Sequence, residues 1–272
     1  MKYIILVLSG LLFVNNSFGQ TEDEILAEAY LLYNSEKASW NGTDVFLEKF
    51  PEKGSLIGGY LSYAEDSKHS CIFFDQAEDP NLLAKITFNK DFNIEQVEID
   101  TISRKLNLLE KDLFIIRKLA MNEVMQDTLF KQYQNTSLNP IPIIVGKEKK
   151  VFLLTGSQKS GVVVIGNDYL LTFNKNNKLK KKRALHNNIL LFEYYDESEG
   201  DITMHTHLES TGDLITSTDI CTIMLYEKYA KWKQHIVFSE KNVSMWYCDR
   251  DQLLVLTRKA WEKIYDRQNG KK

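Results

Sequence analysis

The sequence predicts an α+β fold: an N-terminal helix, an antiparallel meander and a second helix, followed by a mixed sheet flanked by helices. Three observations predict this class. Residues 22–39 carry apolar side chains at helical spacing. Residues 57–100 alternate short apolar segments with polar turns, a pattern typical of antiparallel strands. Beyond residue 147, many strand-like segments are interrupted by only two helical stretches, which favours a mixed sheet with flanking helices.

The first 19 residues have the pattern of a cleavable signal peptide. Lys2 supplies a positive charge, residues 3–14 are an almost unbroken apolar run, and residues 17–19 place small side chains at the cleavage positions. The run is too short for a comfortable permanent span. We therefore expect an exported chain, periplasmic or secreted, that starts at Gln20 and keeps no stable membrane anchor. The alternative interpretation is a buried N-terminal strand or helix.

The charge of the chain gives no sign of a nucleic-acid partner. Removal of Lys2 with the signal leaves 33 basic residues (34 − 1) against 37 acidic ones, a net charge of −4. The one basic cluster, 178–183, and the acidic stretch 196–201 are each interpreted as solvated turns. The sequence leaves the oligomeric state open.

The three cysteines are too few for a disulfide framework. They are Cys71, Cys221 and Cys248, and none shows the spacing of a thiol-redox motif. Either Cys221 and Cys248 pair in an oxidising compartment, or each cysteine is a small buried apolar residue.

The first unit, residues 20–140, is expected to be a helix–meander–helix unit. The second helix is predicted from an apolar stripe that includes Leu113, Ile116 and Ala120. The expected elements are a helix at 22–39, strands near 57–63, 70–75, 82–89 and 94–100, and a helix at about 108–133.

A boundary is expected near 135–147, because Pro140 and Pro142 cannot continue a helix. The second unit is then 141–272. Gly166-Asn167-Asp168 indicates a hairpin turn between two of its strands. The expected elements are strands near 150–155, 161–166, 169–174, 188–195 and 202–207, a helix at 217–231, strands near 234–239, 243–247 and 252–256, and a helix at 258–267.

The strongest chemical signal is a His-x-His segment followed by a helix that carries an aspartate in its first turn. Because strand side chains repeat every two residues, His205 and His207 point to one face, about 7 Å apart along the strand. Asp219 lies where a carboxylate could join them. Two imidazoles and one carboxylate leave a fourth position for water, which is the arrangement of a catalytic zinc site.

A purely structural interpretation of the same residues stays open. Thr216 and Asp219 have the spacing of a capping box, in which the threonine caps the helix and the aspartate is favoured by its N-terminal dipole. His-x-His on a strand can also be a surface pair or a hydrogen-bonded pair. His186 and His235 lie outside the motif and are interpreted as structural.

The order strand, His-x-His, loop, [Ser/Thr]-x-x-Asp and helix resembles the JAB/MPN (JAMM) zinc metalloprotease family. The segment 151–157 also resembles an early strand and glycine turn of that family, so the resemblance covers roughly residues 145–255. It implies a JAB-like second unit, with zinc as cofactor and His205, His207 and Asp219 as its ligands. It places Thr216 where a family serine helps to hold the oxyanion.

Besides Thr216 in place of the serine and a slightly long loop between His207 and Thr216, two positions depart from the family pattern. Leu208 stands where a proline usually follows the second histidine, and Lys149 stands where the general-base glutamate is expected. The adjacent Glu148 is taken as the base, which requires a one-residue shift that normally turns a strand side chain to the opposite face. Glu193 is the weaker substitute.

The resulting functional expectation is an exported zinc-dependent hydrolase that acts on a peptide or isopeptide bond of a protein or peptide substrate. The alternative is a catalytically inactive JAB-like envelope protein that acts as a binding or scaffold module. The absent glutamate and proline support this alternative, since a fold does not guarantee its familiar activity.

Overall fold

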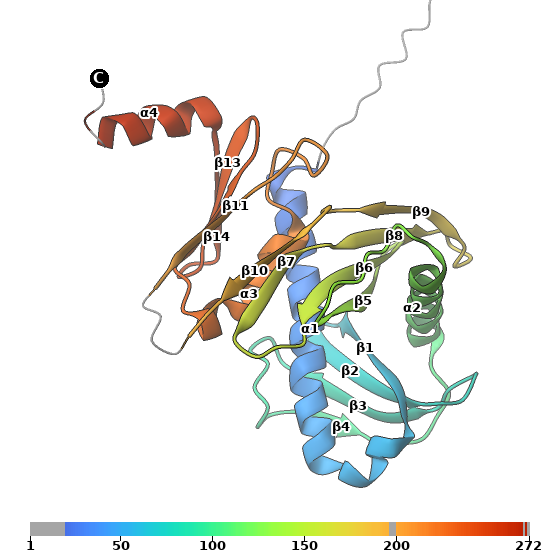
Figure 1. Ribbon diagram of the computed structural model, residues 1–272. Coiled ribbons are helices and arrows are strands. Elements are labelled where there is room, and N and C mark those ends of the chain that lie inside the picture. Colours follow the sequence, from blue (N-terminus) through green and yellow to red (C-terminus); the bar gives the residue numbers. More distant parts are fainter. Residues whose placement is uncertain (1–19, 196–199, 269, 271–272) are drawn as a thin grey trace, which may run out of the picture.

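The computed structural model describes residues 20–195, 200–268 and 270, so the predicted signal peptide lies outside the described residues (Figure 1). It confirms the α+β class, with an N-terminal helix, antiparallel sheets and a mixed sheet flanked by helices. In the described part of the chain, no helix is long and apolar enough to cross a membrane. The elements in chain order are α1 (Glu22–Lys49), a 3-10 helix (Pro51–Leu56), β1 (Ile57–Glu65), β2 (Lys68–Asp75), β3 (Leu82–Phe88), β4 (Glu98–Asp100), α2 (Leu108–Gln126), β5 (Thr136–Val145), β6 (Glu148–Ser157), β7 (Val162–Gly166), β8 (Tyr169–Phe173), β9 (Leu179–Ala184), β10 (Ile189–Glu193), β11 (Ile202–Thr206), α3 (Ser217–Ala230), β12 (Gln234–Phe238), β13 (Asn242–Tyr247), β14 (Gln252–Thr257) and α4 (Arg258–Gln268).

These strands form three four-stranded sheets and one two-stranded ribbon. The first sheet has the antiparallel order β1-β2-β3-β4, as the predicted meander requires. The second is antiparallel with the order β5-β6-β8-β9, and β7 pairs with β10 as the ribbon. The third has the order β11-β12-β13-β14, in which only β11 and β12 are parallel. A parallel pair needs a crossover connection, and α3 provides it.

The first helix runs through the centre of the molecule (Figure 1). It starts at a capping box formed by Thr21 and Glu24 and continues to Lys49, ten residues beyond the predicted end at 39. Its first half packs with α3, and its second half packs on β2 and β3. Gly42 allows the close approach to the sheet, because a Cβ there would lie 2.6 Å from the Cβ of Cys71. The helix therefore belongs to the cores of both halves.

The segment 135–147, where a boundary is expected, contains the strand β5. Pro140 and Pro142 lie within this strand, which pairs with β6 alone at the edge of its sheet. An edge strand has a row of backbone groups without a partner strand, so it tolerates the missing N–H of proline. The prolines here mark a sheet edge.

The basic cluster was misinterpreted as a turn. Residues 179–184 form β9, the opposite edge of the same sheet. Lysines are common on edge strands, where their charge opposes unwanted pairing with another chain.

The hairpin prediction at Gly166-Asn167-Asp168 is wrong as well. The strands on either side do not pair with each other, because β7 pairs with β10 while β8 pairs with β6 and β9. The chain changes sheets at this turn, and Gly166 and Asn167 both adopt positive φ.

The cysteines are free thiols in the structure. Cys71 and Cys221 are fully buried, as the apolar interpretation expects, and Cys248 is partly buried. Burial raises the pKa of the Cys71 thiol to about 12, so it has little thiolate character near neutral pH.

Candidate metal centre

The two motif histidines lie at the carboxyl end of β11 and point into the protein. His205 and His207 are only 7% and 6% exposed, whereas Met204 is 54% exposed and Thr206 is also on the surface. This alternation confirms the prediction that the two imidazoles share one face. The backbone N–H of His207 donates to the carbonyl of Phe238 at 2.8 Å, which holds the residue in place just beyond the strand.

The aspartate reaches the histidines from the first turn of α3. Thr216 is the N-cap, and its hydroxyl oxygen accepts a hydrogen bond from the Asp219 N–H. In return, Asp219 Oδ2 accepts hydrogen bonds from the Thr216 N–H at 2.9 Å and from its hydroxyl at 2.7 Å. The capping box is therefore real, and it orients the carboxylate that the motif predicted. Because the Thr216 hydroxyl hydrogen is used on Asp219, the residue acts here as an orienting group.

A third histidine, which the sequence interpretation placed outside the motif, joins this group. His186 lies in the segment between β9 and β10 and is 7% exposed. Its Nε2 lies 3.3 Å from Asp219 Oδ1. Its Nδ1 faces the buried carboxylate of Asp168 at 3.5 Å, and Asp168 Oδ1 accepts the backbone N–H of Thr155.

The four side chains converge on one point. Their nearest ligand atoms all lie within 4.8 Å of one another. His207 Nε2 lies 3.2 Å from Asp219 Oδ2, and His205 Nε2 lies 3.9 Å from Asp219 Oδ1. Zinc bonds of about 2.0–2.1 Å place two tetrahedral ligands about 3.3 Å apart. The spacing of His186, His205, His207 and Asp219 therefore suits a single metal ion.

Each imidazole presents Nε2 to this point and uses Nδ1 elsewhere. His207 Nδ1 lies 2.9 Å from the Leu214 carbonyl, which can only accept, so a neutral His207 carries its proton on Nδ1 and keeps Nε2 free. His205 Nδ1 lies 2.8 Å from His235 Nε2, and the other nitrogen of His235 lies 2.7 Å from the Thr203 hydroxyl. Such partners are typical of histidines that bind metals, because they fix ring orientation and tautomer.

Burial and the carboxylates control the charge of this cluster. Burial lowers the pKa of His186, but Asp219 and Asp168 outweigh it and raise this pKa to about 10. Burial lowers the pKa of His205 to about 4 and that of His235 to about 3. For Asp219, burial raises the pKa, yet His186 and His205 hold it well below its usual value. The cluster thus contains an ionised carboxylate, Asp219, between a protonated imidazole, His186, and a neutral one, His205.

Buried polar atoms without a hydrogen-bond partner support a metal site more directly than the pKa shifts do. Among the described residues, the buried side-chain atoms without a hydrogen-bond partner are both nitrogens of His186, the Nε2 atoms of His205 and His207, and Asp219 Oδ1. Buried polar atoms are normally paired. Here these atoms gather at one site, and a bound cation would satisfy four of the five. The residues present therefore fit a metal ion.

A partly open cavity of about 210 Å³ lies beside the imidazoles. Its lining includes His186, His205 and His207 together with Thr206 and Leu208. The cavity touches the three rings, whereas their Nε2 atoms and Asp219 Oδ1 are buried behind it.

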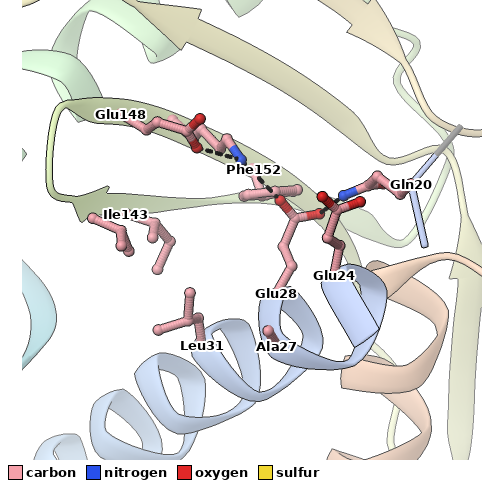
Figure 2. Close-up of a pocket in the computed structure, with 10 residues that line it drawn as sticks. Gln20, Glu24, Ala27, Glu28, Leu31, Ile143, Glu148 and Phe152 are labelled. Atoms are coloured by element: carbon pink, nitrogen blue, oxygen red, sulfur yellow. Dashed lines mark hydrogen bonds and ion pairs between the residues drawn. The ribbon is translucent and has the colours of Figure 1, made fainter. Parts of the chain in front are cut away.

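The predicted base does not reach the cluster. Glu148 is exposed at the start of β6, beside Lys150 at 3.0 Å and next to a pocket formed with the N-terminal end of α1 (Figure 2). Thr155, which contacts the cluster through Asp168, is seven residues further along the strand, or about 20 Å away. Glu193 is also exposed, at the end of β10 that lies away from His186.

Comparisons of this chain with models of known protein families, with curated proteins and with solved structures find no match. The geometry of the cluster is therefore the basis for a functional conclusion.

Proposed function

We propose that this chain is an exported zinc-dependent hydrolase whose ion is held by His205, His207 and Asp219, with His186 as an exchangeable ligand at the fourth position, where water or substrate can replace it. The observation that carries this proposal is the convergence of unpartnered imidazole nitrogens and a carboxylate oxygen on one buried point. The stated resemblance to the JAB/MPN family supports a peptide or isopeptide bond as the substrate. The signal-like segment at residues 1–19 supports export.

The donor set favours zinc among the common metals. Three imidazoles and one carboxylate suit zinc, whereas magnesium and calcium prefer sites made only of oxygen. Copper, nickel and iron also accept imidazole, so the identity of the ion is part of the proposal. When bound, zinc polarises a carbonyl and makes its water acidic.

The chain's own groups would orient this centre. Thr216 holds Asp219, the Leu214 carbonyl holds His207, and His235 holds His205. A substrate carbonyl would approach from the cavity beside the three imidazoles. Asp168, packed behind His186, holds that ring in the cluster.

A second candidate function follows from the fourth side chain. Zinc sites with four protein ligands are usually structural, because no position remains for water or substrate. His186 completes such a set, and neither Glu148 nor Glu193 reaches it. In this case the zinc stabilises a binding or scaffold protein of the cell envelope.

The role of His186 separates the two candidates. Protein loaded with zinc is assayed against casein and a fluorogenic peptide mixture, as wild type and as His186→Asn, His207→Asn and His69→Asn. His69 is the matched control, since it stacks on Phe92 and lies outside the cluster. The hydrolase proposal expects zinc-dependent cleavage by wild type and His69→Asn, and loss of both zinc and cleavage in His207→Asn.

The same variants can contradict the hydrolase proposal. A wild-type chain that holds one zinc but cleaves neither substrate overturns the hydrolase and favours the structural site. In that case His186→Asn should weaken zinc binding as much as His207→Asn does. If the fourth position is exchangeable, His186→Asn should weaken zinc binding by only about tenfold.

A further inference from the structure

A larger cavity among the described residues contains none of the four cluster side chains, although Thr155, whose backbone N–H donates to Asp168, is part of its lining. It has a volume of about 440 Å³ and lies between α1, α2, the β5–β6 hairpin and α3. Charged, polar and aromatic side chains line it together. The lining includes Glu36, Trp40, Tyr60, Arg117, Asn139 and Tyr226.

The negative group of this cavity is Glu36 on α1. The residue is 7% exposed, and its Oε2 accepts a hydrogen bond from the Asn139 side-chain amide at 2.7 Å. No hydrogen bond to Oε1 is found among the described residues, and Glu36 is part of the cavity lining. Burial raises the pKa of this carboxyl to about 7, so a nearby positive charge would be favourable.

The positive group is Arg117 on α2. Its guanidinium lies 5.7 Å from the centre of the Tyr60 ring, and Glu36 is near enough to act on its charge, although the two form no ion pair among the described residues. Burial lowers the pKa of this guanidinium, although it remains charged. A half-buried guanidinium has five donors, and an oxyanion is the group that best satisfies them.

Aromatic side chains form part of the wall. Trp40 and Tyr226 pack edge to face with ring centres 5.4 Å apart, and Tyr60 lies beside the guanidinium. These rings offer an apolar surface and faces that attract a cation. The cavity thus has an unpaired positive group, an unpaired negative oxygen and apolar walls.

We propose that this cavity binds a small zwitterion, an α-amino acid or the ends of a short peptide, with its carboxylate on Arg117 and its ammonium on Glu36. One positive and one negative group match a ligand of zero net charge. A simple anion would be repelled by Glu36 and would leave this carboxylate unpaired. A simple cation would be repelled by Arg117 and would leave the guanidinium unpaired. The proposal does not depend on the metal centre.

The first test screens the purified protein against each proteinogenic L-amino acid at about 10 mM by thermal shift. We expect at least one to raise Tm by about 3 °C. The amino acid with the largest effect is then compared by calorimetry with its N-acetyl derivative and its amide. Each derivative lacks one charge and should bind at least about tenfold more weakly.

Matched variants locate the site. Glu36→Gln and Arg117→Gln should each weaken binding about tenfold or more, and Arg117→Lys should keep part of the affinity. Glu48→Gln on α1 and Lys118→Gln on α2 change exposed residues of the same helices and should bind as wild type does. The proposal is overturned if no amino acid raises Tm, if both cavity variants bind unchanged, or if the N-acetyl derivative binds as tightly as the amino acid.

Discussion

The metal centre and the large cavity are buried polar regions that differ in how their charged groups are spaced. In the metal centre, the facing atoms lie within 4.8 Å of one another. In the large cavity, Glu36 and Arg117 face a space of about 440 Å³ without forming an ion pair. The first spacing fits a single ion, and the second fits a molecule. The distance between polar groups therefore indicates the size of the ligand.

The two regions also differ in how firmly neighbouring groups hold their charged side chains. Around the metal centre, each of His205, His207 and Asp219 makes a hydrogen bond, apart from the atom that faces the metal position, and this bond fixes its orientation. In the cavity, Asn139 holds one oxygen of Glu36, and the Arg117 guanidinium lies over the Tyr60 ring. Fixed ligands favour a metal of defined geometry, whereas freer side chains can adapt to an organic ligand.

The largest expected effect is at the metal centre. Asp219→Asn keeps the size of the side chain but removes its charge, so zinc affinity should fall by about a thousandfold. Competition with a fluorescent chelator measures this change. Asp213→Asn is the control, because Asp213 only pairs with the exposed Lys241. Equal affinities for the two variants would show that Asp219 is not a ligand.

The next effect concerns the ring behind His205. His235→Phe fills a similar space but leaves His205 Nδ1 without its partner, so zinc affinity should fall between about tenfold and a hundredfold. The loss should be smaller than for Asp219→Asn. A cobalt-loaded sample should also show a shifted absorption band, which a change in stability alone would not produce. An unchanged affinity and spectrum would contradict an orienting role for His235.

A stability effect is expected in the large cavity. Because burial raises the pKa of Glu36 from 4.5 to about 7, its protonated form contributes stability below about pH 4.5, and this contribution is lost as pH rises through 7. Glu36→Gln lacks this titration. At pH 8 it should be more stable than wild type by about 3 kcal/mol, and at pH 4 the two should be equal. Urea unfolding at both pH values measures the difference; a constant difference would contradict the buried carboxyl.

The smallest effect compares two capping boxes. Thr216→Ala on α3 and Asn107→Ala on α2 each remove a side-chain cap and should cost about 1 kcal/mol of unfolding free energy. Only the Thr216 variant should also weaken zinc binding, because only that cap holds a candidate ligand. Thermal unfolding with and without zinc separates the two effects. A similar loss of zinc affinity in both variants would indicate a general loss of stability.

The sequence predicted those parts of the metal centre that depend on local pattern. His205 and His207 follow from the two-residue period of a strand, and Asp219 follows from the spacing of a helix start. His186 comes from a separate loop that reaches the cluster through sheet pairing and through Asp168. No short-range period marks such a residue; the only signal was a histidine next to an apolar Leu185 within a polar loop.

The fold predictions had the same limit. The α+β class and most elements follow from periodicity, but the edge strands do not. Pro140 and Pro142 in β5 and the lysines of β9 look like breaks or turns until the order of the sheet shows that both strands lie at edges. The choice of Glu148 depended on an assumed strand register, and β6 places that residue far from the histidines.

Zinc stoichiometry tests the central claim most directly. Wild type and Asp219→Asn are stripped with a chelator, mixed with a slight excess of zinc and examined by native mass spectrometry. We predict one zinc ion per wild-type chain and none retained by the variant. A wild-type chain that keeps no zinc, or a variant that keeps as much as wild type, contradicts a metal centre formed by these four side chains.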